Sequence, residues 1–244
     1  MTDGKAFNFW AHFDDLRVRI TRAAISVFCL FVISISFSSR LLTVLKKPLQ
    51  DVLPQGANVL HFTGPMDVFM VNVKIALFMS VVFGAPFWLY QFWKFIEPAL
   101  YPRERKYVFP FVAASVSCFF LGVAFSYFLM LPMSLQYLVG MGLEVALPII
   151  TVTDYISLLS VMTISCGLVF ETPVLLVLLA HLGIVSADML AAQRRVIFVL
   201  ILIASAILTP PDPISMIAMA IPCYLMFEIS ILVIRYITRP ARAA

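Results

Sequence analysis

The 244-residue sequence contains little charge. Only 12% of its residues are Asp, Glu, Lys or Arg, whereas 62% are hydrophobic. The mean hydropathy is +1.02. A soluble domain of this size needs many more charged side chains to cover its apolar surface, so a soluble protein is excluded. The sequence therefore predicts an integral membrane protein.

The motifs of common catalytic and metal sites are also missing. No glycine-rich loop ends in Gly-Lys-Ser/Thr, so nothing indicates ATP binding, and the three His residues are isolated from one another. No serine lies in a nucleophile elbow. The four Cys residues fall inside apolar runs at unrelated spacings, so we interpret all four as small buried hydrophobic side chains. We expect no enzyme activity, no cofactor, no metal and no nucleic-acid partner.

Six apolar runs are candidates for membrane spans. A helix crosses a hydrocarbon core of about 30 Å with about 20 apolar residues. The fifth run is shorter, so the bilayer beside it should thin, or other protein should cover its ends. We expect the outer ends of the last two spans to lie below the outer rim. The predicted fold is an all-α membrane domain of residues 1–244 with the last two helices short and six spans at roughly 20–38, 72–92, 107–131, 155–182, 196–208 and 214–234.

The positions of the basic residues predict the orientation of these spans. If all six runs cross, most of the 17 Lys and Arg residues fall on one side. The other side keeps only Arg40, Lys46, Lys47 and the boundary residue Lys74. Basic residues are enriched in cytoplasmic loops, so both termini are expected in the cytoplasm. A single fused final span would instead place Arg194 and the basic carboxyl-terminal tail on opposite faces.

The segment FWKFIEPALYPRERKY, residues 92–107, carries charges of both signs between two apolar runs. Pro98 and Pro102 keep it from extending the preceding helix. In one interpretation the basic residues fix topology and Glu104 caps the next helix, where exposed amide dipoles favour a carboxylate. In the other, Glu104 binds a guanidinium, whose planar fork forms two parallel bonds with a carboxylate. Composition alone favours the first interpretation.

The amino-terminal segment WAHFDDLRVRITR, residues 10–22, is expected on the same face. It places Asp14, Asp15 and Arg17 just before the first span. Composition favours a solvated amphipathic lead-in, yet these carboxylates and the inner loop together could serve one cationic partner.

Two carboxylates, Glu171 and Glu228, are expected at membrane depth. A charge there is costly, so each is a functional candidate by default. Pro173 removes a helix hydrogen bond and should kink the fourth span beside Glu171. Glu228 lies nearer the inner end and could reach the interface, so Glu171 is the stronger candidate.

Several motifs, in order along most of the chain, resemble one family. FIEPALYPRER (95–105) resembles the first inner loop of TatC, the multispanning core of the twin-arginine protein translocase. HFDDLRVRI (12–20), PLQDVLPQG (48–56), FETPV (170–174) and LTPPDP (208–213) are similar to its amino-terminal motif, outer cap, fourth span and last outer turn. The resemblance also implies six spans with both ends inside.

The resemblance implies a receptor in the bacterial cytoplasmic (inner) membrane. It would bind twin-arginine signal peptides at the cytoplasmic face and export folded proteins with TatA- and TatB-type partners and other copies of itself, using the proton gradient. Asp15 stands where the family usually has Glu, and Met216 where it usually has Gln. The implied residues are Glu104, Asp15, Arg17, Phe95, Pro98, Leu100 and Tyr101 for signal-peptide binding; Glu171, Thr209, Pro211 and Asp212 for partner docking on a concave surface; and Pro48 and Pro54 for the outer cap.

Two other functions fit the same residues. A solute or ion transporter could use Glu171 as a coupling carboxylate, and it would move protons with solute when the chain is alone in liposomes. A passive assembly scaffold would tolerate replacement of both Glu104 and Glu171 without loss of export.

Overall fold

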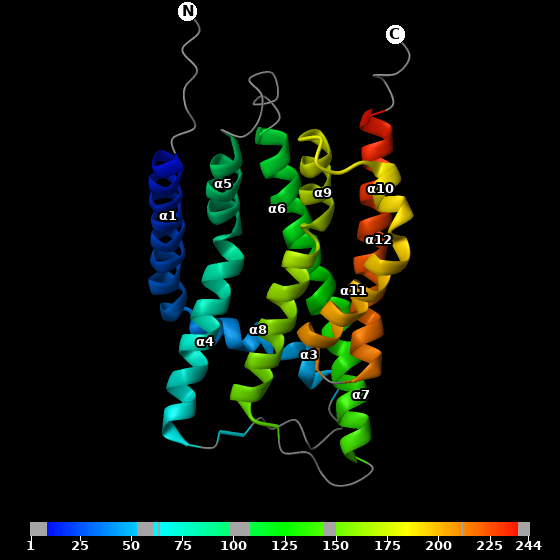
Figure 1. Cartoon of the computed structure of the whole chain (residues 1–244). Helices are drawn as coiled ribbons and strands as arrows, with labels where there is room; N and C mark the ends of the chain where they lie inside the picture. The colour runs from blue at the N-terminus through cyan, green and yellow to red at the C-terminus, as the bar shows by residue number, and fades with distance from the viewer. Residues whose placement is uncertain are drawn as a thin grey trace, which may run out of the picture.

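The computed structural model describes residues 9–52, 61–62, 64–97, 108–143, 150–210 and 212–238. These residues are almost entirely helical, and within them one parallel β-bridge joins His61 to Thr151. The end of the bundle where α1 (Phe9–Ser36) begins is also the end where α12 (Pro213–Thr238) finishes (Figure 1). We call this end the terminal face and the opposite end the far face.

The chain runs back and forth through the bundle, and each such pass consists of one helix or of several consecutive helices. In the described part of the chain, five helical stretches are long and apolar enough to cross a membrane, whereas α11 has only 15 residues. The short helices α2 (Ser38–Leu45), α3 (Lys47–Gln50) and α10 (Ala187–Ala192) lie in the connections. The passes are α1; α4 (Pro65–Phe83) with α5 (Ala85–Ile96); α6 (Val108–Phe125), η3 (Ser126–Met130) and α7 (Leu131–Leu143); α8 (Val152–Val169) with α9 (Thr172–His181); α11 (Arg194–Leu208); and α12.

Several helices extend beyond the spans expected from hydropathy. The first begins at Phe9 rather than near residue 20, the second begins at Pro65 rather than near residue 72, and the third continues to Leu143 rather than ending near residue 131. An α-helix satisfies its backbone groups internally, so it continues past the apolar run that identifies it.

Three passes are interrupted beside a proline. Pro86 is the second residue of α5, Pro173 is the second residue of α9, and the π-helical turn η3 ends two residues before Pro132. Proline cannot donate the backbone hydrogen bond that an uninterrupted helix needs, and at these three positions the preceding turn ends or widens. α12, by contrast, continues as one helix past Pro222. The predicted break in the fourth span is confirmed, because α8 ends at Val169 and α9 begins at Thr172.

The centre of the bundle depends on close contact between α6 and α8. A Cβ atom added at Gly122 would lie 2.7 Å from the Cys166 carbonyl oxygen and 2.9 Å from the Gly167 Cα atom. Both of those atoms are backbone, so no side-chain rotation could relieve the overlap. Glycine at position 122 therefore allows the two helices to meet.

The helices α2 and α3 cross the bundle on the side of the far face (Figure 1). Pro48 and Leu49 on α3 are buried, and two tyrosine hydroxyls bind α2. Tyr127 donates to the Val44 carbonyl oxygen at 2.8 Å and Tyr155 donates to the Leu45 carbonyl oxygen at 2.5 Å. Pro48, which the resemblance assigns to the outer cap, lies within α3.

The last two helices differ in length. α11 is short as expected, with 15 residues and a length of about 22 Å. The expectation of a short last helix is wrong, because α12 has 26 residues and is displaced toward the terminal face. Ser215, near the start of α12, shares a short hydrogen bond with Ser134 near the start of α7. α7 continues to Leu143, about 14 Å farther toward the far face.

The four cysteines are unpaired, and they are not all buried. Cys166 and Cys223 are buried and Cys118 is half-buried, but Cys29 is exposed on α1. The expectation that all four are buried is therefore wrong for Cys29. The hydrophobic side chains of α1 that face away from α4 and α5 are exposed, as expected for a helix bordering lipid.

Candidate functional site

The amino-terminal helix presents a carboxylate near the terminal face. Asp15 Oδ2 accepts a hydrogen bond from Arg19 Nε at 2.7 Å, one helical turn along α1. The Arg19 side chain is 16% exposed and that of Asp15 is 35% exposed. Asp15 therefore already binds the guanidinium group of Arg19. A guanidinium is also the group that Glu104 was expected to bind if Glu104 recognises a ligand. The spacing of four residues was visible in the sequence, but the pair was not anticipated.

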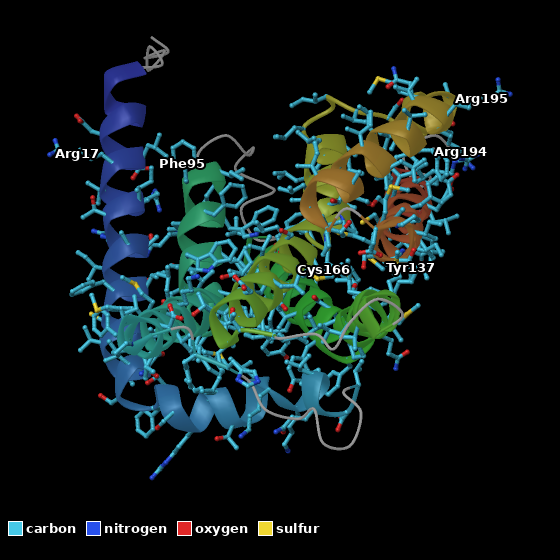
Figure 2. The ribbon with its side chains drawn as sticks, turned by 90° about the horizontal axis from the view of Figure 1, so that it is seen from below. Arg17, Phe95, Tyr137, Cys166, Arg194 and Arg195 are labelled. Carbon is cyan, nitrogen blue, oxygen red and sulfur yellow. The ribbon has the colours of Figure 1, made fainter. Side chains whose placement is uncertain are left out.

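The structure does not bring together all the predicted residues of this face. Arg17 is exposed and projects from the outer side of α1, whereas Phe95 lies on α5, on the other side of α1 (Figure 2). Residues two positions apart on a helix do not share a face, so Arg17 and Asp15 point in different directions.

The end of α5 adds a second ion pair at the terminal face. Lys94 Nζ lies 2.6 Å from Glu97 Oε2, and both side chains are partly exposed. The other residues predicted from this loop, Pro98, Leu100, Tyr101 and Glu104, lie outside the described residues, as do Pro54 and Pro211.

Glu171 occupies the break between α8 and α9. Its side chain is buried, with 5% of the residue exposed, and its Oε1 atom has no hydrogen-bond partner among the described residues. The carboxyl group interacts with Ser115 on α6, and the Ser115 hydroxyl accepts a hydrogen bond from Trp93 Nε1 at 2.7 Å. The site can therefore accept one more hydrogen bond in an apolar setting.

The carboxyl group of Glu171 lies toward α6. It interacts with Ser115 there, and Glu171 is not among the residues that line the groove described next. Glu171 directly precedes Thr172 and Pro173 at the start of α9, so the break between α8 and α9 places it beside the Trp93 and Ser115 pair. That Glu171 faces a concave docking surface stays a prediction.

An apolar groove of about 350 Å³ lies between α9, α11 and α12. It runs along one face of α11, where lining residues recur at helical spacing from Ile197 to Leu208. This is the surface on the last two helices where partner docking was expected. It is lined by Val169, Thr172, Leu176, Leu190, Ile197, Leu200, Ile201, Ala204, Ser205, Leu208, Met219, Cys223 and Phe227.

Thr209 and Asp212, between α11 and α12, form hydrogen bonds with residues close to them in sequence. Thr209 is buried and its hydroxyl donates to the Ser205 carbonyl oxygen at 2.8 Å. Asp212 Oδ1 accepts a hydrogen bond from the Ser215 backbone N–H at 2.6 Å and so caps α12. Asp212 Oδ2 is buried and has no partner among the described residues. A docking role for Thr209 and Asp212 stays a prediction.

A polar cluster joins α11 to α12 near the terminal face, and the sequence did not reveal it. Arg194 binds Glu228 through Nη2 and Oε2 at 2.9 Å and through Nε and Oε1 at 2.8 Å. Tyr224 also donates to Glu228 Oε1 at 2.9 Å. Glu228 was a candidate by its depth, but no local signal links residues 34 positions apart. In Figure 2 the side chains of Arg194 and Arg195 lie at the outer edge of the bundle.

Comparison with known proteins identifies the family. The family described as "Sec-independent protein translocase protein (TatC)" matches residues 11–222. The TatC protein of Desulforapulum autotrophicum is 34% identical over 92% of this chain and 83% of its own length. That of Aquifex aeolicus is 33% identical over 93% of this chain and 95% of its own.

A solved structure gives the same result. The crystal structure of the "Twin Arginine Translocase Receptor- TatC" superposes with a TM-score of 0.82 at 33% identity, covering 93% of this chain and 100% of that one. The sequence and the fold agree, and the chain belongs to the TatC family of protein translocase components.

Proposed function

We propose that this chain is the receptor and core subunit of a twin-arginine translocase, and that it binds the paired arginines of signal peptides at the terminal face. The observation that carries the proposal is the guanidinium held by Asp15 near that face. A carboxylate that binds Arg19 in this way has the chemistry to bind an arginine from another chain.

The proposal places the terminal face in the cytoplasm, with six spans and both termini inside a single membrane domain. The cations of α1 and those at the start of α11 support this orientation, because basic residues are enriched in cytoplasmic segments. Glu104, Pro98, Leu100 and Tyr101 would complete the site together with Asp15 and Phe95. Arg17 projects from the outer side of α1 and would contact the signal peptide only outside this group of residues. Glu104 would be the main carboxylate for the arginine pair.

In the same proposal, single-span TatA- and TatB-type partners dock at the last two helices, and the proton gradient supplies the energy. The groove between α9, α11 and α12 supports docking there, since it is apolar and lies beside the shortest helix. Thr209, Pro211 and Asp212 would contribute at its far end.

Site-specific photo-crosslinking from position 104 in native membranes tests the proposal. A signal peptide bearing Arg-Arg should crosslink to position 104, and a Lys-Lys peptide should crosslink less. Glu104→Gln should weaken binding of the Arg-Arg peptide. Accessibility of position 104 from the side opposite the cytoplasm would contradict the proposal.

A transporter function is the second candidate, favoured by the buried Glu171 and its unpartnered Oε1. It requires solute-dependent proton flux in liposomes that contain this chain alone. The translocase proposal expects no such flux without partners.

A further inference from the structure

Lys74 on α4 lacks a counter-ion among the described residues. Its Nζ atom donates one hydrogen bond, to Ser157 Oγ on α8 at 2.8 Å. Ser157 Oγ in turn donates to the Thr153 carbonyl oxygen at 2.7 Å. An ammonium group has three N–H donors, so Lys74 has donors to spare for an anion.

The carboxylate one turn away on α8 does not neutralise Lys74. Asp154 Oδ2 accepts a hydrogen bond from the Thr151 hydroxyl at 2.7 Å, and the Asp154 backbone N–H donates to the same hydroxyl at 3.1 Å. This carboxylate is held in the first turn of α8, where the exposed backbone N–H groups stabilise its charge.

Lys74 lies at some depth along the bundle axis, measured from the far face. It is about 14 Å along α4 from Pro65. Its partner Ser157 lines the same groove as Thr209 and Pro210 of the α11–α12 turn, and that turn stops short of the end of α7. A cation at such a depth is costly unless an anion or water neutralises it.

The groove beside Ser157 is apolar and small. It has a volume of about 340 Å³, and α8 and the end of α11 line it with Leu158, Val161, Met162, Ile207 and Leu208. Its lining is mostly hydrocarbon, so a single acyl chain can enter it.

We propose that a phospholipid of the leaflet at the far face binds here, with its phosphate at Lys74 and Ser157 and one acyl chain in the groove. Ser157 connects the two parts, because it both bonds Lys74 and lines the groove. Figure 1 shows α8 lying between α4 and α11, so one lipid can contact both sides of α8. The lipid would cover the end of α11, which is too short to meet that leaflet unaided.

Native mass spectrometry of the full-length chain, titrated with phosphatidylglycerol, tests the proposal. We expect one tightly held lipid, about tenfold weaker binding in Lys74→Gln because a charge-assisted bond is lost, and retention in Lys74→Arg. Lys47→Gln is the matched control, since Lys47 on α3 is exposed, and it should bind as the unmodified chain does. Val161→Trp fills the groove from a position that is 57% exposed, so the chain should fold but bind the lipid less well.

Three outcomes would overturn the proposal. Equal weakening by Lys74→Gln and Lys47→Gln would mean non-specific attraction. Displacement of the lipid by glycerol 3-phosphate as efficiently as by phosphatidylglycerol would mean a free phosphate site. Carbodiimide coupling of Lys74 to another polypeptide in native membranes would mean that a partner carboxylate is the counter-ion. None of these outcomes bears on signal-peptide binding, which is measured separately at position 104.

Discussion

Arg194 on α11 and Glu228 on α12 form a two-bond ion pair, with contacts of 2.8 Å and 2.9 Å, that holds the shortest helix against the last one. The pair is partly exposed, at 44% for Arg194 and 27% for Glu228. Because α11 is only 15 residues long, the ion pair fixes its start, and the hydrogen bond from the Thr209 hydroxyl to the Ser205 carbonyl oxygen fixes its end.

Breaking this pair should loosen α11. We expect Arg194→Ala and Glu228→Ala each to lower the free energy of unfolding by about 1 kcal/mol, the upper range for partly exposed pairs. The double variant should lose less than the sum, since both changes remove one interaction. Thermal unfolding in detergent measures the cycle. Arg195→Ala is the control, because exposed Arg195 makes no ion pair with the described part of the chain, and a loss as large as that of Arg194→Ala would contradict the assignment.

The contact between α6 and α8 should not tolerate a larger residue. Gly122→Ala places a Cβ atom 2.7 Å from the Cys166 carbonyl oxygen, so the helices must separate, at a cost of about 1–3 kcal/mol. Gly140→Ala on α7 is the matched control, because nothing lies within 4 Å of a Cβ there. The melting temperatures of the two variants in detergent should differ clearly, and equal values would refute the close contact.

Glu171 should be dispensable for folding. Its Oε1 atom is buried without a partner among the described residues, so Glu171→Gln, which keeps the shape and removes the charge, should leave the melting temperature unchanged or raise it. If the variant folds normally and export of a twin-arginine substrate fails, the carboxylate has a functional role. A large fall in melting temperature would show instead that the carboxylate supports the fold.

Asp15 should contribute to binding of an Arg-Arg signal peptide only after Arg19 is displaced. We expect Asp15→Asn to weaken peptide binding several-fold, and Arg19→Ala to strengthen it, because the carboxylate is then free. Asp14→Asn is the control on the neighbouring, exposed carboxylate. Fluorescence anisotropy with a labelled signal peptide reports all three, and weaker binding in Arg19→Ala would rule out competition for Asp15.

Two features of the fold beside the candidate site were accessible from sequence because their signals are local. Pro173 predicted the break beside Glu171, since the missing N–H of a proline acts within its own helix. The short run at 196–208 predicted the limited reach of α11. The direction of the Glu171 side chain was not predictable, because the Trp93 and Ser115 pair that it faces comes from two other helices.

By itself, the sequence determined that the chain enters a membrane, where its helices break, and which family it resembles. These properties follow from composition, proline positions and short motifs, which act within a few residues. Only the tertiary structure decided that Arg194 meets Glu228, that Lys74 meets Ser157, and that α12 is long but displaced toward the terminal face. Contacts between residues 34 and 83 positions apart depend on how the helices pack, and packing is set by shape complementarity such as the meeting of Gly122 with α8.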